Sequence, residues 1–212
     1  MSAVWAFAGL QTNATGNLVS VPSDVMALDV LIQNDRVAYP WFAPAGDSRG
    51  LVPGTSAIGY VENGEFKLAQ TDDGLLDILY TNNINPIVNF PNEGIKIWGQ
   101  KTLTNVSSSL DRINVARLTA FLRYMLERIT RPFIFEPNDS QTRQAVATVV
   151  EKFLADIVQK RGITDFVVRV DSSNNTPARI DRNELWVDVA LVPTKSVEFI
   201  FIPVRLVNTG EI

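Results

Sequence analysis

Hydrophobic periodicity predicts two long helices in the second half of the chain. In residues 107–131 the apolar side chains fall within one arc of about 140° at roughly 100° per residue. These side chains are Leu118, Phe121, Leu122, Met125, Leu126 and Ile129. In residues 139–161 apolar positions recur with the i, i+3, i+4, i+7 pattern from Val146 to Val158. Pro137 precedes this helix, and Gly162 is expected to end it in the left-handed conformation.

In the first half of the chain, the sequence pattern predicts shorter helices and strands. Residues 3–21 indicate two strands around a polar turn, and Ser23 is expected to cap a helix that ends near Asn34. That helix carries Val25, Leu28 and Ile32 on one apolar stripe. Beyond it the pattern predicts a hairpin over 56–68 with its turn at 62–65, a short helix over 75–80, and strands over 87–90 and 94–98.

Three strands are expected after the helices, over residues 165–170, 185–192 and 197–207. The last is apolar on both faces from Phe199 to Val204, so it should be covered on both sides or paired within an assembly. Burial within the domain is the simpler interpretation for most of it. Pro203 lacks an N–H donor, so one side of this strand should be an edge.

This order of elements predicts an α+β domain, a mixed β-sheet packed with two long and two short helices. With 212 residues and 46% hydrophobic content, the halves 1–105 and 106–212 are expected to form one compact domain. No internal repeat is present.

Composition excludes several classes of function. The chain has no Cys and no His, which removes thiol nucleophiles, Ser-His-Asp triads, and zinc sites built on imidazole or thiolate. A net charge of −4 argues against nucleic acid as a partner, and no apolar run approaches the roughly 20 residues of a membrane span. The N-terminus lacks the basic start of a signal peptide, so the default compartment is the cytoplasm.

Three motifs suggest chemistry, and each has a simpler interpretation. Residues 94–102 nearly spell a phosphate-binding loop, but Gln100 interrupts it and the loop positions favour a strand. Residues 171–176 resemble a calcium loop, but Thr176 stands where Gly is needed. The pair at 72–73 is better explained as helix capping than as acid–base catalysis. We therefore expect no catalytic residue, cofactor or metal.

The face of helix 107–131 opposite its apolar arc is basic. It carries Arg112, Arg117, Arg123, Arg128 and Arg131. Only Asp111 and Glu127 offset them, which leaves the segment at +3, whereas residues 1–105 hold 5 basic and 10 acidic side chains. Arginine suits bidentate contacts with carboxylates at interfaces. A protein interface and a solvated helix face are both open interpretations.

Several phrases resemble the C-terminal region of contractile tail sheath proteins, the family of phage tail sheaths, R-type bacteriocin sheaths and related injection machines. In chain order the phrases are Val21-Pro-Ser-Asp-Val-Met-Ala, Trp41-Phe-Ala-Pro-Ala, Asn83-Ile-Asn-Pro-Ile, Gly94-Ile-Lys-Ile-Trp-Gly-Gln-Lys-Thr-Leu, Arg112-Ile-Asn-Val-Ala-Arg, Phe135-Glu-Pro-Asn-Asp, Asn174-Asn-Thr-Pro and Ile180-Asp. Each phrase is short, but their order and spacing extend over nearly the whole chain. The family's Arg-Gly-Val-Trp-like phrase is altered here to Val37-Ala-Tyr-Pro-Trp.

The resemblance implies a structural subunit without catalysis. It would be a homo-oligomer of hexameric rings, stacked helically around a tail tube protein in the virion tail, assembled in the host cytoplasm and in contact with baseplate and tail terminator proteins. No nucleic acid and no membrane is implied. This region would be the inner core nearest the tube, in a fragment of a longer sheath or an unusually small one.

The resemblance also gives two interfaces as expectations. The five arginines would meet the tube or a neighbouring subunit, and the last strand would exchange with neighbours through Phe199, Ile200, Phe201, Ile202 and Val204. Two alternatives stay open: a sheath-like baseplate or terminator adaptor, and an enzyme that degrades cell walls with carboxylates alone.

Overall fold

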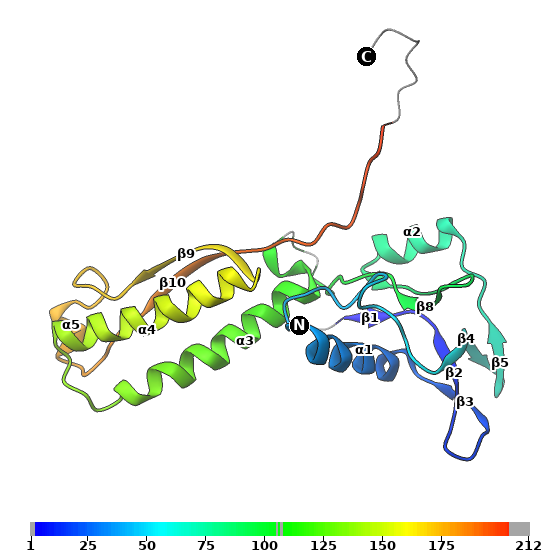
Figure 1. The fold of residues 1–212 in the computed structure, drawn as a ribbon, viewed down its shortest axis with the longest axis horizontal. Coiled ribbons are helices and arrows are strands. Elements are labelled where there is room, and N and C mark those ends of the chain that lie inside the picture. The colour runs from blue at the N-terminus through cyan, green and yellow to red at the C-terminus, as the bar shows by residue number, and fades with distance from the viewer. Residues whose placement is uncertain (1–2, 105, 107, 204–212) are drawn as a thin grey trace, which may run out of the picture.

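The computed structural model describes residues 3–104, 106 and 108–203. The described chain is elongated, with a helical hairpin at one end, small sheets at the other, and a C-terminal segment that projects away from the body (Figure 1). The predicted α+β class is confirmed. The described strands form four small sheets where one mixed sheet was expected, and only β1–β6 is a parallel pair.

The helical end contains the two long helices that periodicity predicts. They are α3 (Ile113–Thr130) and α4 (Ser140–Gln159), and 3-10 turns at Ser109–Asp111 and Arg131–Phe133 flank α3. Strand β9 (Ile163–Arg169) lies against α4 and pairs antiparallel with β10 (Asp188–Pro193). A one-turn helix, α5 (Pro177–Ile180), was not predicted. The fully buried members of this core are Leu118, Val146, Val150, Leu154, Ile157 and Ile163.

The sheet end has the predicted strand, hairpin and helix order. The strands are β1 (Val4–Trp5), β2 (Ala8–Thr12), β3 (Leu18–Val21), β4 (Thr55–Glu62), β5 (Glu65–Leu68), β6 (Ile84–Asn85), β7 (Ile87–Phe90) and β8 (Gly94–Ile97), with helices α1 (Ser23–Val37) and α2 (Asp73–Thr81). Four strands form an antiparallel sheet in the order β3-β2-β4-β5. The β4–β5 turn places Asn63 and Gly64 at φ of 54° and 84°, as its sequence predicts.

The apolar stripe that the sequence predicts on α1 faces solvent instead of the core. Val25, Leu28 and Ile32 are 45%, 55% and 43% exposed, whereas the buried face holds Met26, Ala27, Val30 and Asn34. The buried amide of Asn34 donates to the carbonyls of Tyr39 and Phe42, so a polar residue takes a core position to hold the next turn. Ser23 caps nothing: its hydroxyl donates to the carbonyl of Trp5.

Trp41 connects the two ends of the molecule. Its ring stacks on Tyr39 at 4.7 Å and meets Phe121 edge-on at 5.3 Å. Its indole N–H donates to the carbonyl of Lys160, 3.0 Å away. A residue of the first half is thus part of the core of the second half, and the division at 105/106 stays a prediction.

Helix α4 ends at Gln159, and the left-handed residue that closes it is Arg161, so the expectation for Gly162 is wrong. Arg161 adopts φ of 61°, its N–H bonds to the carbonyl of Val158, and the N–H of Gly162 bonds to that of Ile157. Gly162 is needed for space instead. A Cβ there would lie 2.7 Å from Ile157 Cγ2 and about 3 Å from the ring of Trp41.

Candidate intersubunit interface

The C-terminal arm, residues 194–203, is the most exposed apolar segment of the described chain. It follows β10 as an extended stretch without strand pairing, so the strand predicted over 197–207 is not formed in its described part. Phe199, Ile200, Phe201 and Ile202 are 67%, 77%, 89% and 77% exposed, and burial within the domain is therefore wrong. Val204 lies outside the described residues.

The sheet beside the arm is small. Among the described residues β10 pairs only with β9, and the register shifts by one residue between Val192 and Pro193. Val167 on β9 and Val192 on β10 are exposed apolar side chains. A two-stranded sheet of this kind is marginally stable without further strands or a packed helix, which here is α4.

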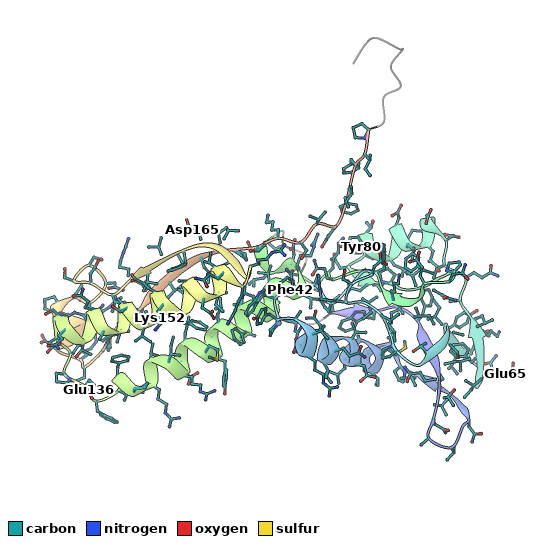
Figure 2. The ribbon with its side chains drawn as sticks, viewed as in Figure 1. Phe42, Glu65, Tyr80, Glu136, Lys152 and Asp165 are labelled. Carbon is teal, nitrogen blue, oxygen red and sulfur yellow. The ribbon has the colours of Figure 1, made fainter. Side chains whose placement is uncertain are left out.

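One carboxylate binds the base of the arm to the body. Glu198 accepts from Arg112 Nε at 2.6 Å and from Arg112 Nη2 at 3.0 Å, which makes a bidentate pair. The hydroxyl of Tyr80 donates to Glu198 Oε2 at 2.7 Å, and the amide of Gln100 donates to Oε1 at 3.1 Å. We call Glu198 with these three partners the Glu198 clamp. Figure 2 shows Tyr80 next to the base of the arm.

The clamp is partly withdrawn from water. The side chains of Glu198 and Arg112 are 17% and 29% exposed. Burial acts to raise the pKa of Glu198, but the hydrogen bonds from Arg112, Tyr80 and Gln100 outweigh it and hold that pKa below its ordinary value. Burial, together with the hydrogen bond to Glu198, raises the pKa of Tyr80. Both groups are therefore held in the forms that make the clamp.

A second cation, Lys101, contacts Tyr80 of the clamp. Lys101 Nζ lies 4.0 Å from the ring centre of Tyr80 and donates to the Tyr80 carbonyl at 2.7 Å. Burial, with the nearby charge of Arg112, lowers the pKa of this lysine. Arg112 also contacts Asp111 at 3.3 Å. Two cations and two carboxylates thus form a balanced cluster at the junction of the two ends.

The five arginines do not form one face. Arg112 precedes α3 with an extended backbone and is part of the clamp. Nη2 of Arg117 donates to both carboxylate oxygens of Asp35 of α1, at 2.7 and 2.6 Å. Arg123, Arg128 and Arg131 are exposed and remain available to a partner.

The three motifs take their simpler interpretations. Gly94–Ile97 is strand β8, and the lysine of the imperfect phosphate loop, Lys101, contacts Tyr80 of the clamp. Asp72 is the N-cap of α2 and accepts from the N–H of Leu75 at 2.7 Å.

The calcium-like turn uses its own oxygens. Asp171 accepts from the N–H and the hydroxyl of Ser173. The buried Asn174 donates to the carbonyls of Arg169 and Trp186. Within the described part of the chain, no three acidic side chains are close enough to hold a metal, and no helix is long and apolar enough to cross a membrane.

Sequence reasoning missed the Glu198 clamp. Its members lie in four separate stretches, at residues 80, 100, 112 and 198, and only the fold brings them together. The available signal was a single acidic residue, Glu198, inside an otherwise apolar run. An isolated carboxylate at the start of such a run needs a partner.

Solved structures share this fold. The sheath complex of an extracellular contractile injection system, PVC, in its contracted state has a TM-score of 0.80 and 25% identity, over 96% of this chain and 55% of that chain. The contracted helical sheath of the anti-feeding prophage has a TM-score of 0.81 and 21% identity, with the same coverage. The fold is therefore that of a contractile sheath subunit.

Sequence relatives identify the family. Residues 105–206 match the phage tail sheath C-terminal domain. The tail sheath protein of Vibrio phage KVP40 is 35% identical over 78% of this chain and 23% of its own length. That of Enterobacteria phage T4 is 32% identical over 93% of this chain and 28% of its own length. The chain belongs to the tail sheath protein family, and it spans about a quarter of these two relatives.

Proposed function

We propose that this chain is a structural subunit of a contractile tail sheath in a virion. Copies would form hexameric rings stacked around a tail tube, and contraction would drive the tube through a cell envelope. The observation that carries the proposal is the exposed apolar arm, which the body holds out by the Glu198 clamp. A monomer gains nothing from leaving four large apolar side chains in water.

The arm would link neighbours by adding a strand to a sheet of the next subunit. Strand addition uses main-chain hydrogen bonds, so it keeps subunits joined while they rotate. The residues proposed for this exchange are Phe199, Ile200, Phe201, Ile202 and Val204. The two-stranded β9–β10 sheet, with exposed Val167 and Val192, is the receiving sheet that we propose.

The remaining basic face would meet an acidic surface of the tube or of a neighbouring subunit. Arg123, Arg128 and Arg131 carry this part of the proposal, because Arg112 and Arg117 are paired within the chain. Contraction then needs no catalytic group. Its energy would come from a metastable packing of subunits that relaxes to a more stable one.

Electron microscopy of the purified chain, alone and with tail tube protein, tests the function. We expect tubes or stacked rings. Single rings that never stack would instead favour the baseplate or terminator adaptor, and a monomer at every concentration would contradict the proposal. Saturable hydrolysis of a cell-wall glycan, abolished by one carboxylate substitution, would favour the enzyme alternative.

A further inference from the structure

The arm has a bound part and a free part. The N–H of Thr194 donates to the carbonyl of Gly162 at 3.1 Å, and the amide of Asn114 donates to the hydroxyl of Ser196 at 3.3 Å. The Glu198 clamp is the last of these attachments along the described arm. From Phe199 onward the described side chains are exposed. The boundary between body and free arm therefore falls at Glu198.

The clamp also decides which parts of the body the arm is attached to. Tyr80 belongs to α2, Gln100 follows β8, and Arg112 is the residue before α3. These elements belong to both ends of the molecule, and Gln100 is buried. Without the clamp, the chain before the free arm would be held by β10 and by two single hydrogen bonds, Thr194 to Gly162 and Asn114 to Ser196.

We propose that Glu198 is a positioning residue that sets the point and direction at which the free arm leaves the body, and that carries load from the arm into both ends of the molecule. The part of the proposal that concerns load between neighbours rests on the proposed function. The part that concerns the direction of the arm applies to the isolated chain.

The physical reason is the weakness of the alternative attachment. Tension on an unclamped arm would act on the single hydrogen bonds of Ser196 and Thr194, and then on the end of β10 at Pro193, where the register with β9 already shifts. Hydrogen bonds at the end of a two-stranded ladder would then break one after another. The bidentate Arg112–Glu198 pair, with the bonds from Tyr80 and Gln100, must break together, so tension that reaches it is resisted before β10 is loaded.

A clamped arm should also bind a neighbour better. An unbound segment that already points in its binding direction loses less conformational freedom on association than a freely moving one. The clamp would thus lower the concentration of subunits needed for assembly, in addition to its mechanical role.

Spin labels test the direction of the arm in the isolated chain. The sequence contains no cysteine, so Phe201→Cys and Lys152→Cys on α4 give two unique labelling sites, both exposed. We expect one narrow peak in the distance distribution between the labels. In Glu198→Ala the narrow peak should be lost, and in Glu198→Gln it should broaden, because the amide keeps an acceptor but loses the charge.

The matched control is Glu127→Ala, which removes an exposed carboxylate from α3. It should leave the narrow peak unchanged. Circular dichroism and the thermal midpoint of each variant show whether the body is folded. If Glu198→Ala unfolds the body, the comparison rests on Glu198→Gln. A narrow peak that persists in a folded Glu198 variant, or a broad distribution in the parent chain, overturns the proposal.

Assembly provides a separate measurement. Glu198→Ala should need about tenfold more protein to form sheath than the parent chain. A tenfold change in affinity is about the free-energy cost of immobilising one long side chain. A parent chain that never assembles could still give a narrow distance distribution that depends on Glu198. In that case the proposed function fails while the positioning role stands. If the parent assembles and Glu198→Ala assembles equally well, the load-bearing role fails.

Discussion

At the scale of single residues, Arg161 and Gly162 have different roles at the C-terminal end of α4. Arg161 takes the left-handed conformation, and Gly162 provides room for the ring of Trp41. A left-handed conformation costs an L-residue with a side chain about 1–2 kcal/mol.

Substitutions at these two positions should therefore have opposite effects. Arg161→Gly should raise the free energy of unfolding by about 0.5–1 kcal/mol, since it removes the strain at φ of 61°. Gly162→Ala should lower it by about 1–3 kcal/mol, because the new methyl group would press on Ile157 and Trp41. Denaturant unfolding measures both. A destabilised Arg161→Gly protein would show that the arginine side chain contributes more than its backbone strain costs.

The charge of Glu198 predicts a dependence of stability on pH. Its pKa in the folded chain lies below the ordinary value of 4.5, so the clamp stabilises the fold fully above that value and loses this contribution as pH falls through the lower, folded pKa. The groups facing Glu198 are Arg112, Tyr80 and Gln100, with Lys101 and Asp111 nearby.

The measurement compares the parent chain with Glu198→Gln by urea unfolding, first near pH 7 and then at steps toward about pH 3. The parent should be more stable near neutral pH, and the difference between the two proteins should shrink toward acid. A difference that does not change with pH would mean that the carboxylate charge does not stabilise the clamp.

At the scale of elements, α3 presents two kinds of arginine. Arg117 ties α3 to Asp35 of α1, whereas Arg123 and Arg128 are exposed. Reversing the charge of Arg123 and Arg128 together should leave the fold intact and weaken attachment to the tube or to neighbours, with less effect at high salt because screening already weakens that contact.

The matched control reverses Arg36 and Lys152, two exposed cations on α1 and α4, and changes the net charge equally. Cosedimentation with tube protein, at low and high salt, measures attachment. If both double variants attach like the parent, the α3 face is only solvated. Arg117→Glu is a different experiment, since it places two carboxylates together and should lower the thermal midpoint.

The elements also show which sequence signals suffice and which do not. The long helices, the Asn63-Gly64 hairpin and the strand at Gly94–Ile97 follow from local patterns, because their burial or turn chemistry is written in consecutive residues. The orientation of α1 does not. Its buried face includes Asn34, which periodicity counts as polar, and its position depends on a close approach to Gly9 of β2 that only the fold reveals.

At the scale of the whole molecule, the Glu198 clamp and the arm show the same limit. Apolarity on both faces of residues 199–204 predicts a segment that is covered or paired, but it could not distinguish burial within the chain from the exposure that Phe199 to Ile202 show. The clamp joins residues that are up to 118 positions apart in sequence, so it required the arrangement of α2, α3 and the arm. The local sequence shows only a lone carboxylate, Glu198, and does not show which partners it meets.

The proposed strand exchange predicts that the main chain of the arm, and not only its side chains, is essential for assembly. Phe201→Pro removes a second N–H from a segment that already contains Pro203, so it should block addition of the arm to a neighbouring sheet wherever that donor is used. Because Phe201 is 89% exposed, the body should stay folded by circular dichroism. Phe201→Ala is the control: it keeps the N–H and should retain more assembly by electron microscopy than the proline variant. A folded Phe201→Pro protein that still forms sheath would place the link between subunits elsewhere in the chain.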